Sequence, residues 1–278
     1  MDIAVHTDRV AFRHDGKPFA EYILNDRFKP HFRSLRTPAG HETTLVSPGD
    51  HRHHKGLMYA LRCEDLNFWE ERPGDGQCGV QEVCSTDLLP ERDGIVQEIL
   101  WKEESGALET YRETRTIRVR RLTDASAFVL SWHTSREALR DHRLIKSPAS
   151  IDLPDGRRIN YHGLGIRLPW MWRFPSRRSG GVEVNRAPAD PLDARGTTAP
   201  SVGFWGLIDG QWKRTVASVT ITQQQTFTWF VLKRDFPYLS IGPSNIEEFT
   251  VGKGDVSEES YSIEIADRPT GFGLEQTS

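Results

Sequence analysis

The chain has 278 residues, of which 36 are Lys or Arg and 39 are Asp or Glu, so its formal net charge at pH 7 is −3 with histidine neutral. This balance excludes a basic nucleic-acid-binding domain, which would carry a strong positive excess. The longest unbroken apolar run covers residues 57–61, whereas a membrane-spanning helix needs roughly 20 apolar residues. We therefore expect neither a nucleic acid nor a membrane as a partner.

The amino terminus and the cysteines indicate a cellular compartment. Residues 1–6 lack the charged and apolar regions of a signal peptide. The three cysteines, at positions 63, 78 and 84, form an odd set without a CxxC pair, so no disulfide framework is expected. We therefore expect a cytoplasmic protein.

Asp-Gly pairs separate extended segments along the chain, at positions 15, 75, 93, 155 and 209. The pair at 15 lies between residues 9–13 and 18–24, and the pair at 93 lies between residues 78–87 and 95–102. Asp-Gly is a strong hairpin signal, because both residues tolerate positive φ. These segments are expected to be antiparallel strands.

Later segments alternate apolar and polar residues with a period of two, as in 111–119, 217–222 and 260–265. This pattern is typical of strands with one buried face. About a dozen strands are predicted, and only 135–143 has a helical pattern. The sequence predicts an all-β fold, a large antiparallel β-sandwich of the kind used by galactose mutarotases, as a single domain over residues 1–278. Residues 173–201, rich in Pro and Gly, are predicted to be a long loop, either a mobile surface segment or a lid.

Three of the ten histidines lie within four residues, at His51, His53 and His54, directly after Asp50. An imidazole can carry a proton at neutral pH, so His53 and His54 are candidate catalytic groups. Asp50 and His51 are candidate substrate-binding residues. In an extended chain His51 and His53 would share one face, and with a carboxylate they could bind a divalent metal, although no HxxxH or HExxH spacing is present. The alternative is a charged surface loop.

Two further candidates for acid/base catalysis are Lys29 and Glu82. Lys29 would act as an acid or base if it were desolvated; alternatively, it is a lysine that protects an edge strand. Glu82 interrupts a strand pattern and is a candidate general base or metal ligand. Glu113 also lies in a strand, and we predict that it pairs with Arg115 on the same face.

The candidate substrate-binding residues include two pairs in other segments. Asn67 and Trp69 offer an amide and an aromatic face that suit hydroxyl-rich ligands; alternatively, they belong to a turn and to the core. His162 and Arg167 flank the glycines of a Gly-Leu-Gly strand, which permit close approach of the backbone. We predict that one pocket on a concave sheet face gathers the following side chains: Lys29, His53, His54, Glu82 and His162.

In this order the motifs resemble a bacterial domain of unknown function that is often labelled "methane oxygenase PmoA". The resemblance covers about residues 10–265. Its strongest motif is Asp-His-Arg-His-His-Lys-Gly at 50–56, where the family usually has Asp-His-Pro-His-His-Arg-Gly. Members of the family tend to accompany sugar oxidoreductases and isomerase-like proteins, so the resemblance implies carbohydrate catabolism. The membrane subunit behind the label is polytopic, and this chain has no apolar run of that length.

The leading hypothesis is a carbohydrate-active acid/base enzyme: a lyase, hydratase or isomerase acting on a sugar, a 3-keto-sugar or a 3-keto-glycoside. A ketone would acidify the adjacent C–H bond, and one imidazole or carboxylate would remove the proton. The first alternative is a non-catalytic sugar-binding accessory module. The second is a metal-dependent oxygenase, as the family label suggests. The cofactor is left open, with a divalent metal as one possibility, and the oligomeric state is not predicted.

Overall fold

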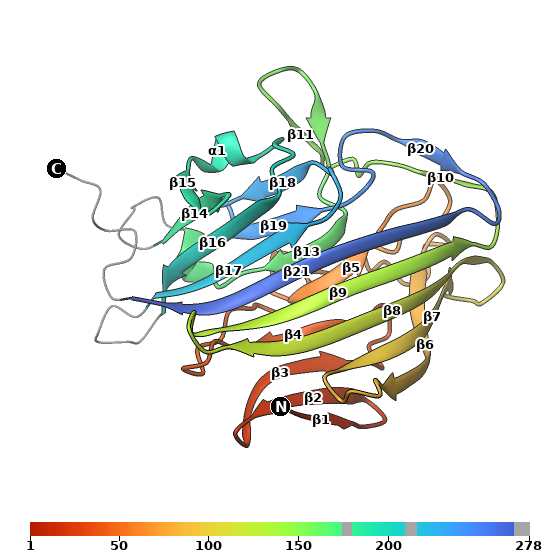
Figure 1. Ribbon diagram of the computed structural model, residues 1–278. Coiled ribbons are helices and arrows are strands. Elements are labelled where there is room, and N and C mark those ends of the chain that lie inside the picture. The colour runs from red at the N-terminus through yellow and green to blue at the C-terminus, as the bar shows by residue number, and fades with distance from the viewer. Residues whose placement is uncertain (174–179, 209–215, 270–278) are drawn as a thin grey trace.

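The computed structural model describes residues 1–173, 180–208 and 216–269 (Figure 1). Two antiparallel sheets face each other. In the described residues the first sheet contains, in spatial order, β1 (Asp2–Val5), β2 (Arg9–His14), β3 (Lys17–Ile23), β4 (His31–Leu35), β5 (Leu57–Ala60), β13 (Gly163–Arg167), β19 (Tyr238–Ile241) and β18 (Trp229–Leu232).

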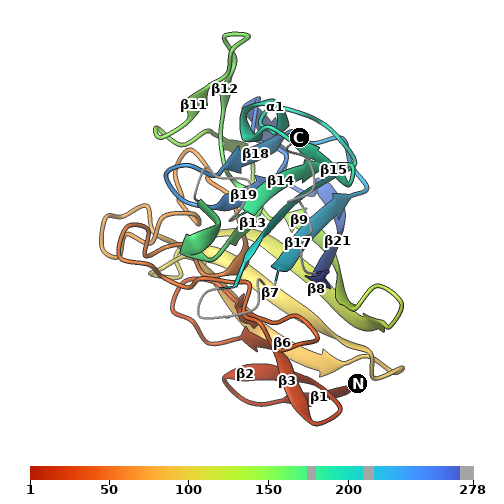
Figure 2. The same cartoon turned by 90° about the vertical axis from the view of Figure 1, so that its left-hand side faces the viewer.

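The second sheet is longer and strongly twisted (Figure 1). Its strands, in spatial order, are β15 (Ala187–Ala189), β14 (Gly180–Val184), β16 (Ser201–Leu207), β17 (Val216–Gln223), β21 (Val256–Arg268), β9 (Ala127–Ala138), β8 (Glu109–Leu122), β7 (Gly94–Glu103) and β6 (Gly79–Leu88). Two small ribbons pair β10 (His142–Leu144) with β20 (Phe249–Val251) and β11 (Ile151–Asp152) with β12 (Arg158–Ile159). The β11–β12 hairpin projects away from both sheets (Figure 2). The described helices are the short η1 (Trp170–Arg173) and α1 (Pro191–Ala194).

The main core lies between the two sheets and confirms the predicted all-β sandwich. Alternate residues of β8 and β17 point into it, as the period of two indicated, and Ile117 and Val219 are fully buried. The hairpin predicted at Asp15-Gly16 is also confirmed, because both residues have positive φ, 49° and 74°, between β2 and β3. Among the described residues no helix is long and apolar enough to cross a membrane.

Two expectations about secondary structure were wrong. Residues 135–143 are not helical: they form the end of β9 and the start of β10, since Ser135 pairs with both β8 and β21. Residues 173–201 are not one long loop: their described part contains β14, β15 and α1, and β14 pairs with β16 in the second sheet. Strand pairing in the sheet outweighs local propensity in both segments. The Asp-Gly pair at 209 lies outside the described residues.

The core also holds a buried ion network on the inner face of the second sheet. The predicted pairing of Glu113 with Arg115 is confirmed, with a distance of 2.8 Å between Oε1 and Nε, and neither side chain is exposed. Glu113 also accepts hydrogen bonds from Trp101 and Thr134. Burial alone would raise the pKa of Glu113, but the adjacent guanidinium lowers it below its usual range. Each charge is therefore compensated within the core.

The outer face of the first sheet is buried as well. On β5, Leu57 and Tyr59 point into the main core, whereas Met58 and Ala60 belong to a second apolar cluster with Trp69 and other residues. Loops cover this face, and one of them carries the three clustered histidines.

Candidate functional site

The segment that carries the clustered histidines folds as consecutive turns. The amide of His51 donates to the carbonyl of Pro48, the amide of His54 donates to that of His51, and Ser47 closes the loop on His54. The segment is therefore not extended, and the arrangement considered for an extended chain does not apply. The turns bring all three rings together: His51 stacks on His54 with centroids 4.7 Å apart, and His53 meets His54 edge-on at 4.6 Å.

An aromatic box surrounds these rings on the outer face of the first sheet. His54 stacks on Tyr238 of β19 at 4.6 Å. The ring centroid of Trp69 lies 6.0 Å from the ring centroid of His53, 5.9 Å from that of His54 and 5.3 Å from that of His162. The structure therefore brings together His53, His54, His162 and Trp69, four of the predicted site residues.

The glycines of β13 make room for this arrangement. A Cβ on Gly165 would collide with the hydroxyl of Tyr238. Gly163 has a φ of +92°, and a Cβ there would collide with the carbonyl of Ile241. The Gly-Leu-Gly motif thus lets Tyr238 lie flat across the strand, where its ring supports His54.

The hydrogen-bond network assigns the tautomer of His162. Asn160 accepts a hydrogen bond from the amide of Ser147 through Oδ1, at 3.3 Å. Its amide nitrogen therefore donates to Nδ1 of His162, at 2.6 Å. In the neutral ring the proton must then be on Nε2. Nε2 is buried and makes no hydrogen bond to any described residue, so His162 presents a free N–H donor.

His53, His54 and His162 are neutral at neutral pH. Burial lowers the pKa of His53 and of His162 to about 3, and it lowers that of His54 well below its usual value. Within the described part of the chain, three further groups of the box lack a hydrogen-bond partner: Nε2 of His53, both ring nitrogens of His54 and Nε1 of Trp69. Buried polar atoms are normally satisfied, so this concentration of free nitrogens makes the box the candidate site.

A charged rim flanks the box. Asp50 accepts from Arg167 at 2.9 Å and lies 3.0 Å from Nδ1 of His51. The guanidinium of Arg167 lies 4.2 Å from the ring centroid of Phe236 and 5.5 Å from that of Trp170. Burial lowers the pKa of Arg167, and Asp50 offsets part of this effect. The predicted substrate-binding residues Asp50, His51 and Arg167 therefore lie together.

Lys29 and Asn67 hold Trp69 in place. The ammonium of Lys29 donates to the carbonyl of Trp69 at 2.7 Å and lies 3.4 Å from Glu71. Its side chain is fully buried, and burial lowers its pKa. The amide oxygen of Asn67 accepts from the backbone of Trp69 and Glu70, which is the turn geometry weighed as an alternative.

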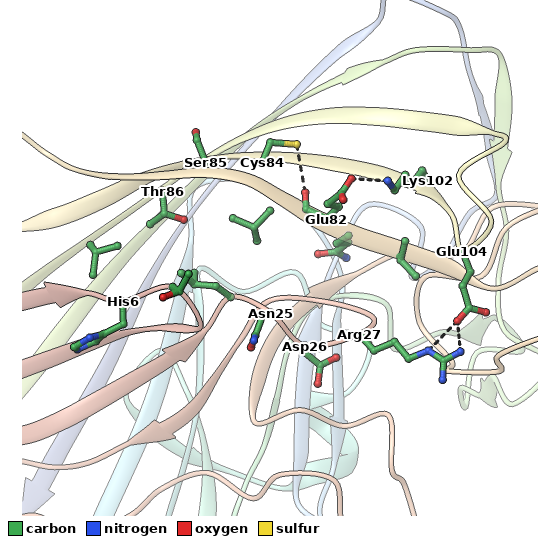
Figure 3. Close-up of a pocket in the computed structure, with 16 residues that line it drawn as sticks. His6, Asn25, Asp26, Arg27, Glu82, Cys84, Ser85, Thr86, Lys102 and Glu104 are labelled. Carbon is green, nitrogen blue, oxygen red and sulfur yellow. Dashed lines mark hydrogen bonds and ion pairs between the residues drawn. The ribbon is translucent and has the colours of Figure 1, made fainter.

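The structure does not bring Glu82 to the histidines. Glu82 lies on β6, in the second sheet; its carboxylate is half exposed and pairs with Lys102. It faces another pocket, of about 640 Å³, between the segment after β3 and β6 (Figure 3). The prediction of one pocket that includes Glu82 is therefore corrected. The histidine loop lies against the first sheet, whereas the segment that contains Glu82 forms β6 of the second sheet. Local strand patterns do not reveal which sheet a segment joins.

Sequence reasoning missed Asn160, Phe236 and Tyr238. The role of Tyr238 becomes clear only once the pairing of β13 with β19 is known, because its ring then lies against Gly165. As for a metal, no group of three or more His, Cys, Asp or Glu side chains in residues 1–173, 180–208 and 216–269 is arranged to hold an ion.

Three solved structures with weak similarity to this chain are the following. The galactose 1-epimerase of Lactobacillus acidophilus NCFM has 7% identity and a TM-score of 0.42, over 96% of this chain and 100% of that one. The galactose mutarotase related enzyme of Lactobacillus acidophilus has 8% identity and a TM-score of 0.41, over 94% of this chain and 98% of that one. The GH36 α-galactosidase AgaB of Geobacillus stearothermophilus has 11% identity and a TM-score of 0.43, over 100% of this chain and 42% of that one.

No curated protein matches the sequence. One family model, described as a family of unknown function (DUF6807), matches residues 9–271; this description carries no methane-oxygenase label.

Proposed function

The chain belongs to the DUF6807 family, and we propose that it is an acid/base enzyme that acts on a sugar, with a 3-keto-sugar or 3-keto-glycoside as its substrate. The observation that carries this proposal is the set of neutral, unpaired imidazole nitrogens around Trp69. A neutral imidazole has one nitrogen that can accept a proton and one N–H that can donate. Removal of a proton beside a ketone needs an acceptor for that proton and a donor to the ketone oxygen.

Substrate access is proposed from the side of the rim. His51 and His53 are partly exposed, and Trp170 is exposed over 38% of its surface. A sugar presents apolar ring faces and hydroxyl oxygens. The box supplies aromatic rings for the faces, and the guanidinium of Arg167 supplies donors for the oxygens.

The proposed chemistry assigns a direction of proton transfer to two histidines. His53, which is partly exposed, accepts a proton from the carbon beside the ketone. The N–H of His162 donates to the ketone oxygen and stabilises the enolate that forms. The electron pair of the broken C–H bond then expels an oxygen substituent at the β carbon. That oxygen takes the proton that His53 has accepted, so His53 returns to its neutral form and the elimination is complete without a further reagent.

Proton exchange tests this proposal directly. The protein is incubated with methyl 3-keto-glucosides in D₂O and followed by NMR. Loss of the proton signal beside the ketone, faster than in buffer, is expected even where elimination is slow. Binding without any exchange across several such substrates would instead indicate a sugar-binding accessory module. Turnover that requires oxygen and a redox-active metal would indicate the oxygenase.

The buried histidines also predict how stability depends on pH. His162 has a pKa of about 3 in the folded chain and about 6.5 when unfolded. Between these values the unfolded state binds more protons than the folded state. The contribution of neutral His162 to the free energy of unfolding is therefore fully present above about pH 6.5 and is lost as the pH falls towards 3. The slope for this group is about 1.4 kcal/mol per pH unit.

Urea unfolding at pH 7, 6, 5 and 4 measures the slope. His162→Gln should flatten it, whereas His133→Gln, an exposed histidine of β9, serves as the control. An unchanged slope in His162→Gln would contradict the assignment of a buried neutral imidazole.

A further inference from the structure

A further pocket is lined by residues of β20, the end of β9 and the start of β21; β10 and β20 pass beside these strand ends in Figure 1. Its volume is about 410 Å³. Most of its wall is apolar and comes from segments far apart in the sequence: Leu61, Leu144, Phe227, Pro243, Phe249 and Val251. Phe249 is 38% exposed, so the pocket opens to solvent.

Arg136 forms the floor of this pocket. Its side chain is 1% exposed, and Nη2 pairs with Glu259. Its Nε and Nη1 atoms make no hydrogen bond to any described residue. The carboxylate of Glu259 is already occupied, because the hydroxyls of Tyr59 and Tyr261 donate to its two oxygens at 2.8 and 2.5 Å. The floor therefore offers donors rather than acceptors.

Arg115, on the neighbouring strand, shows that these free donors are not a general property of the core. Arg115 is equally buried, yet all three of its nitrogens donate hydrogen bonds, to Glu113, Tyr22 and Gln81. A buried donor without an acceptor is destabilising. Of these two arginines, Arg136 is the one that lines this pocket, and it is also the one whose nitrogens lack hydrogen-bond partners among the described residues.

The charges at the pocket select the class of ligand. Asp255, Glu258 and Glu259 line it together with Arg136, so three carboxylates oppose one guanidinium and an anion would be repelled. Phe227 and Phe249 offer aromatic surface. A neutral molecule with an apolar ring face and oxygen acceptors matches both features.

We propose that this pocket is a second ligand site, which binds a neutral pyranose ring with its oxygens on Nε and Nη1 of Arg136. The site is separate from the histidine box. Arg136 lies on the inner face of the second sheet, whereas the box lies on the outer face of the first. None of the residues that line this pocket belongs to the histidine box. The proposal does not depend on the proposed reaction.

The test titrates methyl β-D-glucopyranoside and methyl β-D-galactopyranoside into the isotope-labelled full chain and follows backbone amide signals. Shifts are expected at residues 136, 249–251 and 255–259. Arg136→Lys keeps the charge that faces Glu259 but removes the free guanidinium donors, and should weaken binding at least ten-fold. Arg118→Lys, a half-exposed arginine of β8, is the matched control. If Arg136→Lys does not fold, Phe249→Ala replaces it, with the same expected direction.

Two further measurements test which class of ligand binds and whether this pocket is independent of the histidine box. Acetate, an anion without a ring, should give no shifts at these residues, and His53→Gln should bind both glycosides here as the unaltered chain does. The proposal is overturned if neither glycoside shifts these signals, if acetate binds as tightly as the glycosides, or if folded Arg136→Lys and Phe249→Ala both bind unchanged.

Discussion

Replacing His53 with glutamine is expected to slow proton exchange from a 3-keto-glucoside by about 100-fold or more, the usual contribution of a positioned general base. Glutamine has a similar reach and can still make hydrogen bonds, but it cannot accept a proton. His53 is only partly buried, so the substitution should leave the melting temperature nearly unchanged. Rate and melting temperature are measured on the same preparation.

Two companion variants show what the rate loss means. His133→Gln, remote on the outer face of β9, should keep the full rate. His54→Gln should lose both rate and stability, because the ring of His54 stacks against both His51 and Tyr238. An unchanged rate in folded His53→Gln and in folded His54→Gln would remove this loop from the mechanism.

Glu113→Gln is expected to destabilise the protein by about 3–5 kcal/mol, the usual cost of breaking a buried ion pair from one side. The substitution leaves the guanidinium of Arg115 buried with no carboxylate beside it, because Glu113 provides both of its ionic contacts. For a chain of this size the loss corresponds to a fall in melting temperature of roughly 10 °C. Thermal and urea unfolding measure it.

The control is Glu91→Gln, which removes an exposed partner of Arg118 and should cost less than about 1 kcal/mol. Similar melting temperatures for the two variants would show that the buried network contributes no more than a surface ion pair.

The fold was predictable because its signals are local. Alternation in 111–119 and 217–222 fixed the buried faces of β8 and β17, and Asp15-Gly16 fixed the first hairpin. The errors fell where pairing in the sheet decides the conformation. Residues 135–143 have a helical composition but lie beside β21, and the proline-rich segment after 180 contains β14 because β16 offers it a partner. A short-range pattern does not contain that information.

The site was predictable in part for the same reason. His51, His53 and His54 are adjacent in sequence, so any compact turn gathers them, and the glycines around Leu164 marked a place of close approach. Glu82 was assigned to the wrong site, and Tyr238 and Arg136 were missed. Their roles depend on which strands become neighbours across a sheet, and a residue's partner there can lie far away in the sequence, as Glu259 lies 123 positions from Arg136.

The two faces of β5 connect the candidate site to the core through strand register. Leu57 and Tyr59 fill the core, while Met58 and Ala60 support the histidine box. A one-residue insertion would exchange the two sets, so that Leu57 and Tyr59 would face the histidine box and Met58 and Ala60 would face the core. This part of the chain can therefore evolve new specificity by substitution in the covering loops, but hardly by insertion or deletion within the strands. Variation in substrate should accordingly be concentrated in loop length, with the strands kept at constant length.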